Sequence, residues 1–136
     1  MINGMETTVL EKWMPTENLG KHYDVNEISL TESGLSFMLI SDKRNAPKKI
    51  KSFVITWDTS DVITYNVTDE TYRDDCWKLD FEKDGRFYVC RSSDLIDYFK
   101  KKSPLFPKDP IHFMIVGTNT VVDVIAKNYP ETAVTD

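Results

Sequence analysis

The sequence has no long hydrophobic run and no visible targeting segment. Apolar residues never follow one another for more than four positions, as from Phe113 to Val116, whereas a membrane-spanning helix needs about 20 of them. The chain does not open with a basic stretch followed by an apolar run, which is the pattern of a secretory signal. These absences predict a soluble protein of the cytoplasm that does not contact a membrane.

Residues suited to catalysis are scarce. The chain has two histidines, His22 and His112, and five scattered glycines. It lacks the Gly-x-Ser-x-Gly pattern of a nucleophilic serine and the closely spaced glycines of a phosphate-binding loop. His112 stands in a strand-like stretch beside Phe113, which favours a hydrogen-bonded structural histidine. We therefore predict a protein without enzymatic activity, metal or cofactor; only a carboxylate pair brought together by the fold, as in glycosidases, stays open.

The two cysteines carry no functional spacing. Cys76 and Cys90 lie fourteen positions apart in strand-like stretches, which matches neither a redox motif nor a zinc site. This arrangement favours buried free thiols, and a disulfide between paired strands remains the alternative.

The composition is that of an ordinary globular domain. The chain has 136 residues, of which 40% are hydrophobic and 29% charged, values far from those of disordered proteins. We expect one domain over residues 1–136, with residues 1–20 as an irregular arm or a short edge strand.

Alternating apolar residues predict a β-rich fold. The alternation runs through residues 35–39, 53–57, 63–67 and 77–81. We expect 53–57 to form a hairpin with 63–67, and 77–81 to form one with 87–90 across the turn at Asp84-Gly85. Residues 111–116 and 121–126 are apolar on both faces, so they should pair centrally in the sheet.

One segment has helical spacing instead. Ser92, Ser93 and Asp94 offer amino-terminal capping groups, apolar residues follow at helical intervals, and three lysines end the run. We predict a helix near residues 93–102. The expected fold class is β-rich α+β, with a curved antiparallel sheet or half-open barrel of seven or eight strands and this helix across one opening.

Charge is unevenly distributed along the chain, which carries a net −5. Residues 58–84 contain nine acidic and three basic residues, whereas residues 42–51 contain five basic residues and one acid. The short basic segment holds no aromatic residue for base stacking, and the acidic total opposes a phosphate backbone, which argues against direct nucleic-acid binding. An acidic surface that also carries aromatic residues suits the capture of a basic protein, although acids on strand faces and turns also serve solubility.

Several stretches resemble small bacterial immunity proteins, the partners of contact-dependent or secreted polymorphic toxins. The similar stretches, spread over residues 10–131, are Phe53 to Trp57, Tyr65 to Glu70, Ser92 to Phe99, His112 to Ile115, Val122 to Ile125 and Tyr129 to Glu131. The resemblance lies in patterns of fold type and transfers no set of site residues. It implies a cytoplasmic antitoxin that binds the toxin's carboxy-terminal catalytic domain and blocks it sterically.

These observations lead to one main hypothesis and two alternatives. The main hypothesis is a non-catalytic inhibitor of a basic toxin domain such as a nuclease, whose partner-binding residues are Asp69, Glu70, Tyr72, Asp74, Asp75 and Trp77. The first alternative is a small-ligand carrier with an apolar pocket inside the sheet, lined by Phe37, Trp57, Tyr65, Phe87 and Phe99. The second is an oligomer-forming subunit that pairs through residues 111–125.

Overall fold

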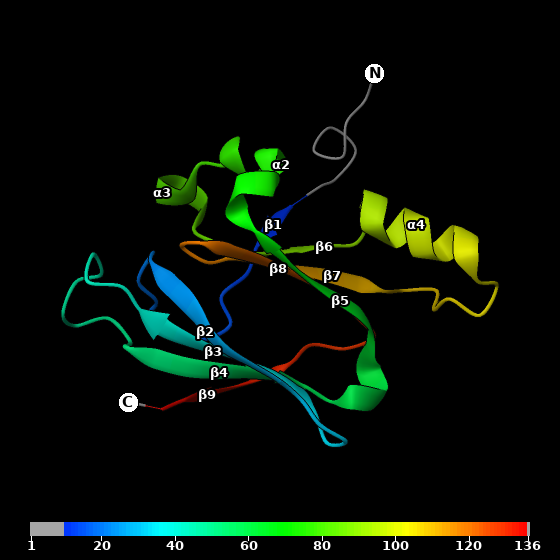
Figure 1. Cartoon of the computed structure of the whole chain (residues 1–136), viewed down its shortest axis with the longest axis horizontal. Helices are drawn as coiled ribbons and strands as arrows, with labels where there is room; N and C mark the ends of the chain where they lie inside the picture. The colour runs from blue at the N-terminus through cyan, green and yellow to red at the C-terminus, as the bar shows by residue number, and fades with distance from the viewer. Residues whose placement is uncertain (1–9, 136) are drawn as a thin grey trace.

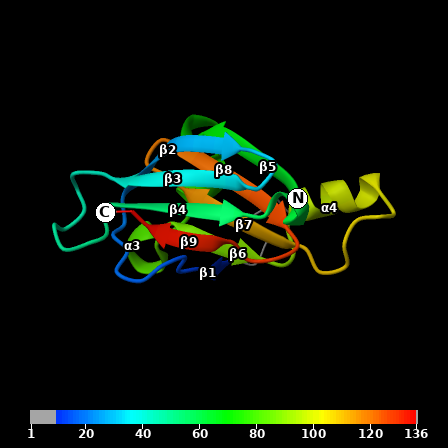
Figure 2. The same ribbon diagram turned by 90° about the horizontal axis from the view of Figure 1, so that it is seen from below.

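Two antiparallel sheets packed face to face form the fold, which we describe from a computed structural model covering residues 10–135 (Figure 1). The five-stranded sheet has the order β1-β6-β7-β8-β5 and the four-stranded sheet the order β2-β3-β4-β9. Viewed from below, the smaller sheet lies in front of the larger one (Figure 2). The strands are β1 (Glu11–Lys12), β2 (Tyr23–Leu30), β3 (Leu35–Ser41), β4 (Ser52–Trp57), β5 (Val62–Asp69), β6 (Phe87–Cys90), β7 (Ile111–Val116), β8 (Thr120–Ala126) and β9 (Glu131–Val134).

The helices lie on the face of the five-stranded sheet that points away from the smaller sheet (Figure 1). They are α2 (Asp74–Trp77), α3 (Phe81–Asp84) and α4 (Asp94–Lys102), and 3-10 turns occur at η1 (Thr59–Asp61) and η2 (Glu70–Tyr72). The expected β-rich α+β class is therefore confirmed. The single curved sheet or half-open barrel is wrong, because the described strands divide into two sheets that do not close into a barrel.

Aromatic residues fill the space between the two sheets. β3 and β4 turn alternate residues inward, among them Phe37 and Trp57, as the alternation in the sequence predicts. Phe113 of β7 meets them from the larger sheet, and its ring centroid lies 5.1 Å from that of Trp57 and 5.0 Å from that of Trp13. Removing rings of this size from water is the main source of stability for such a core.

The central hairpin is confirmed. β7 pairs with β8 and with β6, and nearly every residue of β7 and β8 is buried. The inner face of these strands packs against the smaller sheet, and their outer face is partly covered by α2, α3 and α4. Burial on both faces explains why apolar residues occupy both faces of the two strands.

Both other predicted hairpins are wrong. β4 pairs with β3 and β9, whereas β5 pairs with β8 in the other sheet. The alternating segment 77–81 is not a strand, since it links the short helices α2 and α3. Asp80 caps α3 by accepting a hydrogen bond from the Lys83 N–H at 3.2 Å, and Gly85, with φ of 75°, ends that helix instead of turning a hairpin.

The predicted helix is confirmed as α4. Ser93 caps it, with the Ser93 hydroxyl oxygen accepting a hydrogen bond from the Ile96 N–H at 3.1 Å. The amino-terminal segment contributes the two-residue edge strand β1, which pairs with β6. Residues 1–9 of the predicted arm lie outside the described residues.

Candidate functional site

A groove of about 510 Å³ runs across the outer face of the five-stranded sheet. One wall is the segment that enters α2, and the other is the amino-terminal part of α4. β5, β7 and β8 form the floor. The groove is lined by Leu10, Asn66, Arg73, Asp75, Ser93, Asp94, Leu95, Tyr98, His112, Met114 and Asp123.

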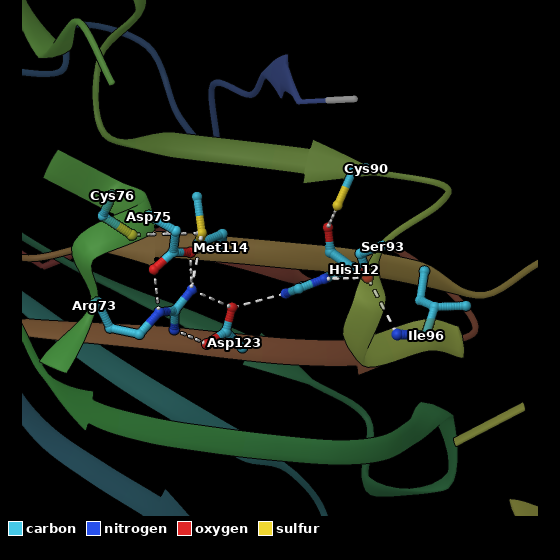
Figure 3. Close-up of polar contacts among 9 residues, drawn as sticks. All are labelled: Arg73, Asp75, Cys76, Cys90, Ser93, Ile96, His112, Met114 and Asp123. Atoms are coloured by element: carbon cyan, nitrogen blue, oxygen red, sulfur yellow. Dashed lines mark hydrogen bonds and ion pairs between the residues drawn. The ribbon is translucent and has the colours of Figure 1, made fainter. Parts of the chain in front are cut away.

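A row of buried polar side chains crosses the groove (Figure 3). His112 on β7 lies between Ser93 and Asp123: its Nδ1 is 2.8 Å from the Ser93 Oγ, and its Nε2 is 2.7 Å from the Asp123 Oδ1. All three residues are buried, and Asp123 on β8 is only 2% exposed. The row therefore joins the first turn of α4 to both central strands.

Arg73 extends the row to the other wall. It bonds Asp75 twice, from Nε and from Nη2 at 3.0 Å each, and it donates from Nη1 to Asp123. Burial alone would lower the pKa of Arg73, but the hydrogen bonds to Asp75 and the charge of Asp123 outweigh it and raise that pKa. The guanidinium thus stays charged and fastens the chain entering α2 to the sheet.

Asp123 is held as a carboxylate. Burial alone would raise the pKa of Asp123, but the hydrogen bond from His112 and the charge of Arg73 outweigh burial and lower it. An ionised Asp123 accepts a hydrogen bond, so the His112 Nε2 carries a proton. In the neutral imidazole, Nδ1 then accepts from the Ser93 hydroxyl, whose oxygen is itself the acceptor for the Ile96 N–H.

The order Ser93, His112, Asp123 is that of a nucleophilic triad, but two contacts favour a positioning role. The Ser93 oxygen caps α4, so one of its lone pairs is engaged by a backbone N–H. Asp123 forms an ion pair with Arg73, whereas the acid of a triad serves to stabilise the imidazolium. The row of polar side chains therefore holds both walls of the groove against the sheet.

The predicted partner-binding residues lie at the end of β5, in η2 and in α2, at the start of a segment that we call the acidic lobe, residues 69–84. Tyr72 is 78% exposed and Trp77 63% exposed, whereas tryptophan is highly buried on average. Glu70 and Asp74 are also exposed. The lobe thus presents two large aromatic surfaces among acidic side chains.

Two of the predicted residues have contacts within the protein. Asp69 caps η2 by accepting a hydrogen bond from the Thr71 N–H at 2.9 Å, which lowers the pKa of Asp69. Asp75 is half-buried against Arg73 and faces the groove. Asp75 therefore shapes the lobe, whereas Asp69 caps η2 and is also exposed.

Of the five residues suggested for an interior carrier pocket, four pack together between the sheets, with the ring centroid of Tyr65 6.3 Å from that of Phe37 at the edge of the core. Phe37, Trp57 and Phe87 are buried and packed in the core between the sheets. Tyr65 is exposed on the edge strand β5, and Phe99 lies on α4. The groove is on the opposite face of the five-stranded sheet from this core.

Both cysteines are buried free thiols, as the sequence favoured. Burial raises the pKa of Cys76 and of Cys90 to about 12. Cys76 lies on α2 rather than on a strand, and its Sγ is 3.9 Å from the Met114 Sδ (Figure 3). Thiols of this kind are packing groups rather than nucleophiles.

Arg73 and Asp123 were not predicted as site residues, and His112 was not predicted to contact Ser93. A signal was present, because His112 and Asp123 interrupt the two most apolar strands of the chain. A polar residue in a strand that is buried on both faces requires a buried partner. The partners of His112 and Asp123 could not be identified from the sequence, because they lie up to 50 positions away.

Comparison with known proteins gave no match to a protein family, to a curated protein or to a solved structure. Among residues 10–135, no cluster of three or more His, Cys, Asp and Glu side chains is placed to hold a metal ion. No helix in the described part of the chain is long and apolar enough to span a membrane.

Proposed function

We propose that the protein is a non-catalytic binding module that captures a basic protein through its acidic lobe. The observation that carries the proposal is the exposure of Tyr72 and Trp77, at 78% and 63%, beside the acidic side chains of Glu70 and Asp74. Aromatic residues supply much of the affinity at protein interfaces, while surrounding charges speed encounter with an oppositely charged partner.

The attachment of the lobe supports the same proposal. Arg73 lies between Tyr72 and Asp74 in the chain and binds the buried Asp123 of the central strand β8. A surface held in one conformation before binding loses less entropy when the complex forms. The short helices of the lobe therefore act as a preorganised platform.

The resemblance to immunity proteins suggests the identity of the partner. We propose that it is a toxin domain, such as a nuclease, and that the bound protein blocks its catalytic site sterically. A nuclease must bind a phosphate backbone, so its active face carries basic residues. Such a face complements the acidic lobe in charge.

The test is capture of the partner from the native host by the tagged full-length protein, with the product of the gene immediately upstream included as a candidate. We expect a basic protein in a near 1:1 ratio. The variant Tyr72→Ser/Trp77→Ser should weaken its binding about 100-fold, the loss typical of two interface anchors. The matched control is Leu105→Ser, which removes another exposed apolar side chain, 90% exposed, from the connector after α4.

Charge variants provide the second arm of the test. Glu70→Lys/Asp74→Lys should slow association and reduce its dependence on salt, because exposed charges act mainly on the encounter rate. Glu32→Lys/Asp109→Lys makes the same change in charge at two exposed positions outside the lobe. Equal effects of the two pairs, or full binding by the aromatic variant, would show that the lobe is not the binding surface.

Carriage of a small ligand is a second candidate, supported by the groove of about 510 Å³ with its converging polar groups. Native mass spectrometry of protein purified from the host distinguishes the two. A retained small molecule, lost from Tyr98→Ala, would favour carriage. Protein without a bound molecule that still captures the basic partner would favour the inhibitor.

A further inference from the structure

We infer that the groove receives a lysine or arginine side chain from the captured protein. This inference rests on the proposed function, because it names what the partner inserts next to the acidic lobe. Arg73 connects the two surfaces: it lies in the lobe and also lines the groove. The lobe and the groove are therefore adjacent, since Arg73 directly follows Tyr72 in the chain.

The charges of the groove select a cation. The lining contains three carboxylates, those of Asp75, Asp94 and Asp123, and one guanidinium, that of Arg73. Arg73 already binds both Asp75 and Asp123, so it has little capacity left for an incoming anion. The positive end of the α4 dipole is offset by Asp94 in the first helical turn. The lining thus carries a formal net charge of −2, from three carboxylates and one guanidinium, and this sign favours an inserted ammonium or guanidinium over an anion.

The remaining lining suits the stem of a basic side chain. Leu10, Leu95 and Met114 are apolar, and the exposed ring of Tyr98 stands on the α4 wall. Lysine and arginine combine a methylene stem, which packs on apolar surface, with a charged end that pairs with carboxylates. The ring of Tyr98 already carries Lys102, whose Nζ lies 5.2 Å from the ring centroid, so this ring adds apolar surface for the stem. A volume of about 510 Å³ has room for such a side chain together with adjacent backbone.

The test uses the intact protein and does not require the partner. Amide resonances are followed by NMR during titration with N-acetyl-arginine methylamide. The norleucine counterpart serves as the uncharged control ligand, and the glutamate counterpart serves as the negatively charged one. We expect saturable shifts at Asn66, Leu95 and Tyr98 with the arginine compound, at a dissociation constant in the millimolar range, as for other ligands of this size.

Variants locate the binding. Tyr98→Ala, which removes packing surface for the stem, and, independently, Asp94→Asn should each weaken binding of the arginine compound about fivefold. The matched control is Asp109→Asn, which makes the same change at an exposed position of the connector and should leave the affinity unchanged. The spectrum of each variant also reports whether it has folded, and two separate wall variants keep the test valid if one of them does not fold.

Three results would overturn the inference. Absence of shifts at the groove is one, and equal binding of the norleucine compound is another, because it would show an apolar site without charge selection. Shifts confined to Tyr72 and Trp77 are the third, and they would leave the proposed capture by the lobe intact. Conversely, the arginine compound could bind the groove while the lobe variants leave partner capture unchanged. The proposed function would then be wrong, and the cation site would stand.

Discussion

The two faces of the five-stranded sheet are buried by different means. The inner face packs rings and aliphatic side chains against the smaller sheet, with Phe113 between Trp13 and Trp57. The outer face buries His112 and Asp123 in the same two central strands. Apolar packing alone would have sufficed to cover a sheet.

The difference indicates what the outer face is for. Buried ion pairs contribute little net stability compared with apolar residues of similar volume, because desolvation offsets the attraction. The polar row therefore needs another explanation, and its geometry provides one. It fixes the acidic lobe through Arg73 and α4 through Ser93, and so sets the two walls of the groove.

The largest expected effect lies on the inner face. Phe113→Ala should lower the free energy of unfolding by about 4 kcal/mol, because it leaves a cavity among rings that cannot collapse into it. Urea denaturation followed by fluorescence measures the change. Leu105→Ala, at a position 90% exposed, is the control and should change stability by less than about 0.5 kcal/mol. A loss below about 1 kcal/mol for Phe113→Ala would contradict the packing described for this face.

Breaking the polar row at Arg73 should have the next largest effect. Arg73→Met leaves Asp123 as a buried carboxylate without its cation and should cost about 3 kcal/mol. Adding Asp123→Asn in the same chain removes the stranded charge and should recover part of that loss. If the double variant is less stable than Arg73→Met, the guanidinium acts through packing and not through its charge.

Lowering the pH should weaken the contacts that Asp123 makes on the outer face. The pKa of Asp123 is lowered in the folded protein, so its ionised form contributes stability above the ordinary aspartate pKa, near 3.9. That contribution is lost as the pH falls through the folded pKa. The difference in unfolding free energy between the unmodified protein and Asp123→Asn should therefore be largest near neutral pH and shrink below about pH 4. A difference that stays constant down to pH 2 would contradict an ionised Asp123.

The smallest effect separates the two roles of Ser93. Ser93→Ala should cost about 1 kcal/mol, since it removes the cap of α4 and a partner of His112. Ser92→Ala, at the exposed neighbouring position, is the control. Because Ser93 is assigned to positioning, a fluorophosphonate probe should leave it unlabelled. Labelling at Ser93 that disappears in a His112→Gln variant would instead show an activated nucleophile.

The sequence predicted those parts of the fold that depend on local signals. The alternation in β3, β4 and β5 and the capping serine of α4 act within a few residues, and each was assigned correctly. Pairing is not local: β4 and β5 are joined by a short loop yet belong to different sheets. Segment 77–81 alternates like a strand, but capping by Asp80 and the left-handed Gly85 stabilise helical turns at that point.

For the candidate site, the sequence pointed to exposed side chains of the acidic lobe but not to the buried contacts that hold the lobe in place. Tyr72 and Trp77 are exposed as the hypothesis of partner binding requires. The contacts of Arg73 with Asp123 and of Ser93 with His112 join residues 50 and 19 positions apart. Interactions at such separations follow from the sheet order, which the alternation of apolar residues does not specify.

Hydrogen exchange of the chain, alone and mixed with the proposed basic partner, tests most directly the proposal that the outer face of the five-stranded sheet binds that partner. We predict slower exchange on binding in residues 69–78 and in the first turns of α4, with β2, β3 and β4 unchanged. Protection confined to the four-stranded sheet, with the acidic lobe exchanging as in the free protein, would contradict the account.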